Sequence, residues 1–236
     1  LAGNLSGGQK KLLELGRTMM VDAKIVFLDE VGAGVNRTLL NTIGDAILRL
    51  NKERGYTFCM IEHDMDFIGR LCDPVICMAE GTVLAEGTID EIKSNEQVIE
   101  AYLGTGLKNK TPQPLRWDRL QSNDPGSCPG QSRQRPAMTY LSATNMTGGY
   151  GGADILHDCT IEAAEGEIAV IVGPNGAGKS TAMKAVFGML NIHTGSVMLD
   201  GEDSTKLSPQ ARVAKGMAFV PQTSNVFPSM SVEENL

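Results

Sequence analysis

The sequence lacks several features that would place it in whole classes of protein. No stretch approaches the length of a membrane-spanning helix, which needs about 18 continuous apolar residues. The first residues also lack the basic segment followed by an apolar segment that is typical of a secretory signal. We therefore expect that the chain itself does not cross a membrane. Positive charge is not in excess, since the formal net charge is −7 over 236 residues. Non-specific binding of nucleic acid is not expected, and any bound anion must be held locally.

The cysteines have neither CxxC spacing nor the arrangement of a disulfide framework. This argues against zinc and predicts reduced thiols of a cytosolic protein, most of them buried. The five are Cys59, Cys72, Cys77, Cys128 and Cys159. With 42% hydrophobic and 21% charged residues, the composition is ordinary for a soluble globular protein, and the length allows one large α/β domain or two small ones.

Helical and extended patterns alternate along the first hundred residues. Strands separated by helices at this spacing predict a parallel sheet that is covered on both faces. A hairpin edge then leads into a helix with a possible capping box, TIDE, at residues 88–91. The expected helices are 6–22, 39–55 and a short one after Asp64; the expected strands are 24–30, 56–63 and 74–81, followed by the hairpin edge and capped helix of 81–92.

Residues 107–136 have no apolar period and hold half of the ten prolines, which is typical of a linker. After it the alternation resumes, and no motif of one half recurs in the other. Strands are expected at 138–147, 154–163, 166–173, 195–201 and 217–222, and helices at 179–190 and 208–216. The chain begins with Leu1 rather than Met and stops inside SVEENL, the apparent start of a helix, so we expect both ends to be cut.

The sequence GPNGAGKS at residues 173–180 fits the phosphate-loop pattern G-x-x-x-x-G-K-[ST], with a buried strand before it and a helix after it. The glycines let backbone N–H groups face phosphate oxygens at the positive end of the helix. Lys179 would pair with the β- and γ-phosphates, and the Ser180 hydroxyl would bind Mg²⁺. The alternative is a glycine-rich turn with an exposed lysine.

Polar side chains also follow other predicted strands. Asp29 and Glu30 end the strand IVFLDE, where Asp29 would hold Mg²⁺ through water and Glu30 would act as a general base. Alone, such a pair is more often a solvated strand end. His63 and Gln222 each follow a strand and would reach phosphate, water or Mg²⁺. A single histidine is more often a hydrogen-bonded structural side chain, and Gln222 alone would be a loop glutamine.

Tyr150, in the turn GGYGG, would stack on a purine or pack on its own loop. The two other histidines, His157 and His193, lack any such context and are interpreted as structural.

Taken together, these residues resemble the nucleotide-binding domains of ABC ATPases. LSGGQ at residues 5–9 matches the family signature, IVFLDE its magnesium and base strand, and EVGAGVN its D-loop. His63 is similar to its switch histidine, Tyr150 to its adenine-stacking aromatic and Gln222 to its Q-loop glutamine. The resemblance implies an α/β P-loop NTPase of ABC ATPase type, with a mostly parallel sheet flanked by helices and a small antiparallel β subdomain.

The resemblance also implies the site and its cofactors, ATP and Mg²⁺. Glu30, His63 and Gln222 would be catalytic, and Ser180, Gln222 and Asp29 would hold the metal. The nucleotide would be bound by Tyr150, Gly173, Asn175, Gly176, Ala177, Gly178, Lys179, Ser180 and Thr181, and by the signature residues Ser6, Gly7, Gly8 and Gln9. Two positions depart from the family pattern. Val31 replaces a proline and is expected to loosen the turn after Glu30, and Asn36 stands where the D-loop often has Asp.

The order of the motifs suggests two incomplete domains. Residues 1–106 resemble the C-terminal half of one ABC ATPase domain and 137–236 the N-terminal half of a second, joined by the linker 107–136. Both are similar to the paired ATPases of branched-chain amino-acid importers, although urea and short-amide importers look much the same. The signature of the first half would then face the ATP held by Lys179, whereas Asp29, Glu30 and His63 would serve a phosphate loop upstream. Such a fragment should bind ATP better than it hydrolyses it.

The expected partners follow from this resemblance: integral-membrane permease subunits at the cytoplasmic face of the membrane, a second ATPase domain, intramolecular if the pair is fused, and indirectly a substrate-binding protein. Nucleic acid is not expected. One alternative is a non-transport tandem ABC ATPase. Another is a circularly permuted or truncated single domain, whose halves pack together. That packing would bring Lys179, Asp29, Glu30 and His63 into one site and leave residues 6–8 away from it.

Overall fold

The computed structural model describes residues 1–72, 74–103, 139–223 and 225–236. The expected linker, 107–136, and Cys128 lie outside these residues. Six strands form a central sheet in the order β10-β1-β2-β7-β3-β4. All neighbouring pairs are parallel except β3 and β4. The strands are β1 (Ile25–Asp29), β2 (Thr57–Ile61), β3 (Val75–Ala79), β4 (Thr82–Gly87), β7 (Ile168–Val172) and β10 (Met217–Val220).

The two halves of the sequence share this sheet. The strand β7, which leads into the phosphate loop, lies between β2 and β3 of the first half, and β10 lies beside β1. All five residues of each of β1, β2, β3 and β7 are buried, as their continuous apolar runs predict. The expectation that the halves pack on each other is confirmed.

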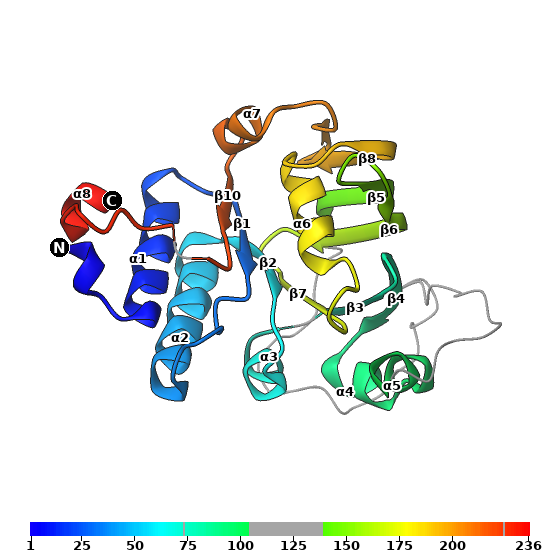
Figure 1. Ribbon diagram of the computed structural model, residues 1–236, viewed down its shortest axis with the longest axis horizontal. Helices are drawn as coiled ribbons and strands as arrows, with labels where there is room; N and C mark the ends of the chain where they lie inside the picture. The colour runs from blue at the N-terminus through cyan, green and yellow to red at the C-terminus, as the bar shows by residue number, and fades with distance from the viewer. Residues whose placement is uncertain (73, 104–138, 224) are drawn as a thin grey trace.

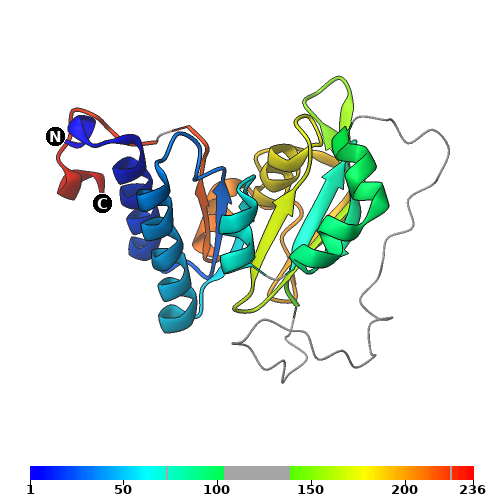
Figure 2. The same ribbon diagram turned by 90° about the horizontal axis from the view of Figure 1, so that it is seen from below.

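Two apolar clusters cover the faces of the central sheet. One contains side chains from α1, α2, α3, α4 and α5, and the other joins α6 and the second sheet to the opposite face. Figure 1 shows α6 between the two sheets, and Figure 2 shows both chain ends beside α1. The helices are η1 (Ala2–Asn4), α1 (Gly7–Met20), α2 (Arg37–Arg54), α3 (Met65–Leu71), α4 (Ile89–Ser94), α5 (Glu96–Leu103), α6 (Lys179–Phe187), α7 (Pro209–Ala214) and α8 (Val232–Asn235).

The second sheet is antiparallel, with the order β6-β5-β8-β9. Its strands are β5 (Thr139–Gly149), β6 (Asp154–Ala164), β8 (Ile192–Leu199) and β9 (Glu202–Asp203). The predicted fold class is therefore confirmed: a mostly parallel sheet flanked by helices, with a small antiparallel sheet beside it. Among the described residues, no helix combines the length and apolar character needed to cross a bilayer.

Local signals account for most element boundaries. Thr88 and Glu91 form the capping box predicted for α4. The helix α6 ends at Phe187, earlier than expected, because Gly188 adopts a left-handed conformation and caps it. The helix α5 was not expected from the pattern; Asn95 begins it by accepting hydrogen bonds from the Gln97 and Val98 N–H groups.

Candidate nucleotide and magnesium site

The phosphate-loop sequence forms a tight turn between β7 and α6. Gly173 has a φ of 149°, and a Cβ there would lie 2.2 Å from the Met78 carbonyl oxygen. Gly178 adopts the left-handed region at the start of α6, and no side chain of the described residues caps this helix. The first-turn N–H groups of α6 are therefore suited to an anion, and phosphate binding at this loop stays a prediction.

Lys179 folds back over this loop. It is only 6% exposed, and its Nζ donates to the carbonyl oxygens of Gly173 at 2.9 Å and Pro174 at 3.0 Å. Burial lowers the pKa of Lys179, while the Glu30 and Asp29 carboxylates oppose that change. Two backbone carbonyl oxygens thus hold the Lys179 ammonium at the loop where phosphate would lie.

Asp29 and Ser180 meet across the two halves of the chain. The Ser180 hydroxyl, in the first turn of α6, donates to Asp29 Oδ1 at the end of β1 over 3.0 Å. Asp29 is buried; burial raises its pKa, and the Ser180 hydrogen bond opposes that rise. A buried carboxylate beside a hydroxyl offers the oxygen ligands that Mg²⁺ prefers. These residues fit a magnesium ion.

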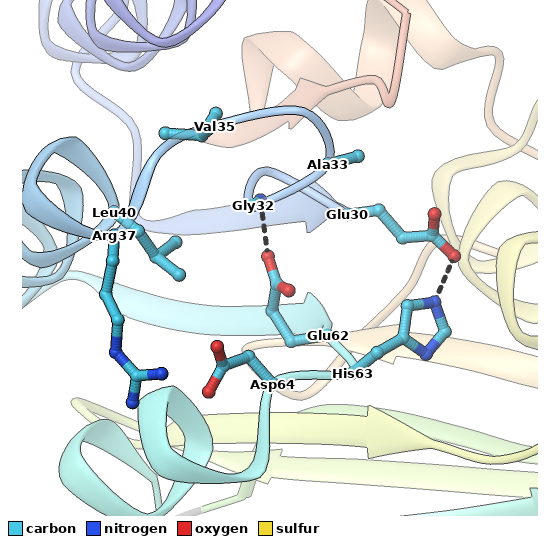
Figure 3. Close-up of a pocket in the computed structure, with 9 residues that line it drawn as sticks. All are labelled: Glu30, Gly32, Ala33, Val35, Arg37, Leu40, Glu62, His63 and Asp64. Carbon is cyan, nitrogen blue, oxygen red and sulfur yellow. Dashed lines mark hydrogen bonds and ion pairs between the residues drawn. The ribbon is translucent and has the colours of Figure 1, made fainter.

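Glu30 is the meeting point of the predicted catalytic side chains. Its Oε1 lies 2.6 Å from His63 Nε2, and its Oε2 accepts a hydrogen bond from the Gln222 amide (Figure 3 shows Glu30 and His63). These residues follow β1, β2 and β10, whose carboxyl ends meet at one edge of the sheet. Glu30 itself has a φ of 49°, in the left-handed region.

The turn after Glu30 is well supported despite the missing proline. Val31 is 3% exposed and packs in the main apolar cluster. The Ala33 N–H donates to the Glu30 carbonyl at 3.1 Å, and Asn36 caps α2 by accepting from the Leu39 N–H at 2.9 Å. The branched Val31 side chain thus anchors the turn in the core, while the looser turn expected from the missing proline stays a prediction.

The signature residues lie elsewhere. Ser6 and Gln9 form a capping box at the start of α1, on the far side of β1 from α6 (Figure 1). Gly8 lies against α2, where a Cβ would clash with the Leu39 side chain. Within one chain, the structure does not bring residues 6–8 to Lys179, as expected for packed halves.

Tyr150 lies in the exposed turn between β5 and β6 and is 58% exposed. The Lys184 Nζ, on α6, lies 5.9 Å from the centre of its ring and 3.4 Å from its hydroxyl. The ring is therefore presented near the phosphate-loop helix, with one face available for stacking. His157 and His193 lie on β6 and β8, outside this cluster.

The sequence did not single out two further groups beside the site. Glu62 is a buried carboxylate that lines a cavity of about 270 Å³ together with Glu30 and His63 (Figure 3). Lys11 and Glu14 form a buried ion pair, 3.0 Å apart, on α1. Lys11 donates to the Pro221 carbonyl, next to Gln222. The i, i+3 spacing of Lys11 and Glu14 on a helix was the sequence signal that could have indicated this ion pair.

Two segments of the chain match family models. Residues 156–235 match the model described as ABC transporter, and residues 79–108 match the model described as Branched-chain amino acid ATP-binding cassette transporter. The chain resembles the ATP-binding proteins of ABC transporters. The ABC-type segment contains Lys179, Ser180 and Gln222, and the branched-chain-type segment covers β4, α4 and α5.

Individual ABC relatives cover different shares of the chain. The probable branched-chain amino acid transport ATP-binding proteins LivG and LivF of Archaeoglobus fulgidus are 45% and 43% identical, over 44% and 41% of this chain and 40% and 41% of their own lengths. The ribose import ATP-binding protein RbsA of Shouchella clausii is 28% identical over 100% of this chain and 43% of its own length. The chain thus spans less than half of each relative. A crystal structure of the ADP conformation of an ABC transporter ATP-binding cassette is 40% identical over 44% of this chain and 42% of its own, with a TM-score of 0.40.

Proposed function

We propose that this chain binds ATP with Mg²⁺ and belongs to an ATPase that energises a membrane permease. The observation that carries the proposal is the gathering of Asp29, Glu30, His63 and Gln222 beside the loop of Lys179 and Ser180. Chance alone would not bring four polar side chains from three strand ends to one phosphate loop. The matches to ABC transporter ATP-binding proteins support the same reading.

Each residue has a role that its position allows. The first turn of α6 and Lys179 bind the phosphates, and Asp29 and Ser180 hold Mg²⁺, which neutralises phosphate charge when bound. Glu30 takes a proton from the attacking water while the water oxygen bonds to the γ-phosphorus and the bond to the ADP oxygen breaks. His63 and Gln222 orient the Glu30 carboxylate and the water, and Tyr150 stacks on the base.

For the transported substrate we propose branched-chain or related amino acids. The LivG and LivF relatives are 45% and 43% identical where they align, against 28% for the ribose importer, and residues 79–108 match the branched-chain model. The implied partners are permease subunits at the cytoplasmic face of the membrane and, indirectly, a substrate-binding protein. Disruption of the coding gene should reduce uptake of labelled leucine and leave ribose uptake unchanged; the reverse pattern would assign a sugar.

We also propose that residues 1–106 and 137–236 are halves of two successive ATPase domains. A ribose import relative aligns with 100% of this chain while covering 43% of its own length, which supports this order of motifs within a longer protein. In that setting a second phosphate loop would use Asp29, Glu30 and His63. The chain as it stands gathers them at Lys179 instead, as a single permuted domain would.

Phosphate release from Mg²⁺-ATP tests the proposed chemistry directly. Glu30→Gln should keep the affinity for a fluorescent ATP analogue and lower hydrolysis by a factor of about 10²–10⁴, because the general base is lost. Glu91→Gln, remote in the α4 capping box, serves as the matched control. Equal hydrolysis by the Glu30→Gln variant and the wild type would exclude Glu30 as the base. A chain that binds ATP and releases no phosphate would be a binding module only.

A further inference from the structure

Glu62 is a buried acid to which the chemistry above gives no task. It follows β2, is 3% exposed, and directs its carboxylate toward Gly32 in the turn after β1 (Figure 3). Its Oε1 accepts a hydrogen bond from the Gly32 N–H at 2.8 Å. Burial raises the pKa of Glu62, and the backbone N–H groups of Gly32 and His63 oppose that rise.

This hydrogen bond joins the two loops that carry the catalytic pair. Gly32 lies two residues after Glu30, and Glu62 directly precedes His63 in the chain. One carboxylate therefore joins the end of β1 to the end of β2. The same two loops carry Glu30 and His63, and Glu30 Oε1 lies 2.6 Å from His63 Nε2.

The loop after β1 needs such support. Glu30 has a φ of 49°, a strained conformation that a non-glycine residue keeps only where its surroundings enforce it. The turn is pressed closely against Glu62: a Cβ at Gly32 would lie 3.1 Å from Glu62 Oε2 and 3.2 Å from Leu40 Cδ1. The buried carboxylate and the leucine thus fix the position of the Gly32 backbone, and through it the direction of Glu30.

We propose that Glu62 is a positioning residue for ATP hydrolysis, which holds Glu30 and His63 in contact by binding the Gly32 N–H from the position directly before His63. The inference rests on the proposed function, because it assigns the Glu30–His63 pair a catalytic task. In this role Glu62 acts through the Glu30–His63 pair rather than by contact with the nucleotide. Its removal should therefore lower kcat for ATP and leave KM nearly unchanged.

A double-mutant cycle separates positioning from general support of the fold. In the full chain, Glu62→Ala should lower kcat at least tenfold with KM within twofold. In a His63→Ala background the same change should lower kcat less than twofold, because the contact that Glu62 sets no longer exists. Glu62→Gln keeps the size and one acceptor oxygen, so its kcat should lie between the wild type and Glu62→Ala.

Glu167→Ala is the matched control. It also removes a carboxylate that holds a backbone N–H, that of Ala164 at 2.7 Å, but beside the start of β7, at the other end of the sheet. Its effect on kcat should be the same with and without His63. If the fold-changes in kcat caused by Glu62→Ala and His63→Ala simply multiply in the double variant, the proposal is wrong. It is also wrong if Glu62→Ala changes only KM.

Amide hydrogen exchange tests the hydrogen bond between Glu62 and the Gly32 N–H without relying on ATP hydrolysis. In Glu62→Ala, the Gly32 N–H should exchange at least tenfold faster than in the wild type, while exchange in α6 stays unchanged. Unchanged exchange at Gly32 would overturn the proposal. If Glu62→Ala does not fold, Glu62→Gln carries both measurements with smaller expected changes. A wild type that releases no phosphate would refute the proposed function, whereas the exchange result would still decide whether Glu62 holds the two loops.

Discussion

Replacing Ile171 with alanine should destabilise both halves of the chain at once. Ile171 is fully buried on β7, where it is paired with Ile61 on β2 and Ile76 on β3. Since β2 and β3 belong to the first half, the cavity opens between strands from both. An Ile→Ala change in a packed core costs about 2–5 kcal/mol, and the close neighbours on both sides leave little room for collapse. We therefore expect a loss of about 3 kcal/mol in the free energy of unfolding.

Urea unfolding followed by far-ultraviolet circular dichroism measures this loss, and amide exchange with mass spectrometry shows where it falls. Exchange through global unfolding should accelerate by the same factor in β1, β2 and β7. Ile99→Ala, at a 44% exposed position on α5, should change stability by less than about 0.5 kcal/mol. Two separate transitions, or acceleration confined to residues 139–220, would refute the shared sheet.

The other predictions concern single side chains. Asp29→Asn should stabilise the protein without Mg²⁺ at neutral pH. Burial raises the Asp29 pKa, so the charged carboxylate destabilises the fold at pH values above that pKa. In urea titrations, the gain in the free energy of unfolding should shrink as the pH falls toward 3.8, the ordinary pKa of Asp. Tyr150→Ala should weaken binding of ATP by roughly 1–3 kcal/mol but leave binding of inorganic triphosphate unchanged, as isothermal titration would measure, because only base stacking is lost. Arg212→Ala should lower the free energy of unfolding by about 3 kcal/mol in urea titrations, because the buried guanidinium bonds the Leu207, Thr205 and Val186 carbonyls.

The sequence predicted those parts of the fold that depend on local signals. The apolar runs of β1, β2 and β7, the capping box at Thr88 and the glycines of the phosphate loop each act over a few residues, so their spacing is visible in the chain. The position of β7 between β2 and β3 depends on packing between segments about a hundred residues apart. Only one of the alternatives drawn from the sequence, the single domain whose halves pack together, led us to expect it.

Within the candidate site, the residue types were visible but their contacts were not. Asp29, Glu30 and His63 follow apolar runs, which marks them as strand ends. Glu62 follows the same apolar run as His63, but its burial and its contact with the Gly32 N–H on another loop are not visible in the sequence. Lys11 likewise looks like an ordinary helix-surface charge, whereas the structure buries it in an ion pair with Glu14 and a hydrogen bond to the Pro221 carbonyl.

The central claim is that residues from both halves of the chain complete one ATP and magnesium site. Binding of a fluorescent ATP analogue to the wild type, Lys179→Ala and Asp29→Asn, with and without Mg²⁺, tests it most directly. Lys179→Ala should bind at least tenfold more weakly in both conditions. Asp29→Asn should match the wild type without Mg²⁺ and lose most of the affinity that Mg²⁺ adds, because Asp29 faces Ser180 of the same loop. If Asp29→Asn binds Mg²⁺-ATP as tightly as the wild type, the two halves do not share a site.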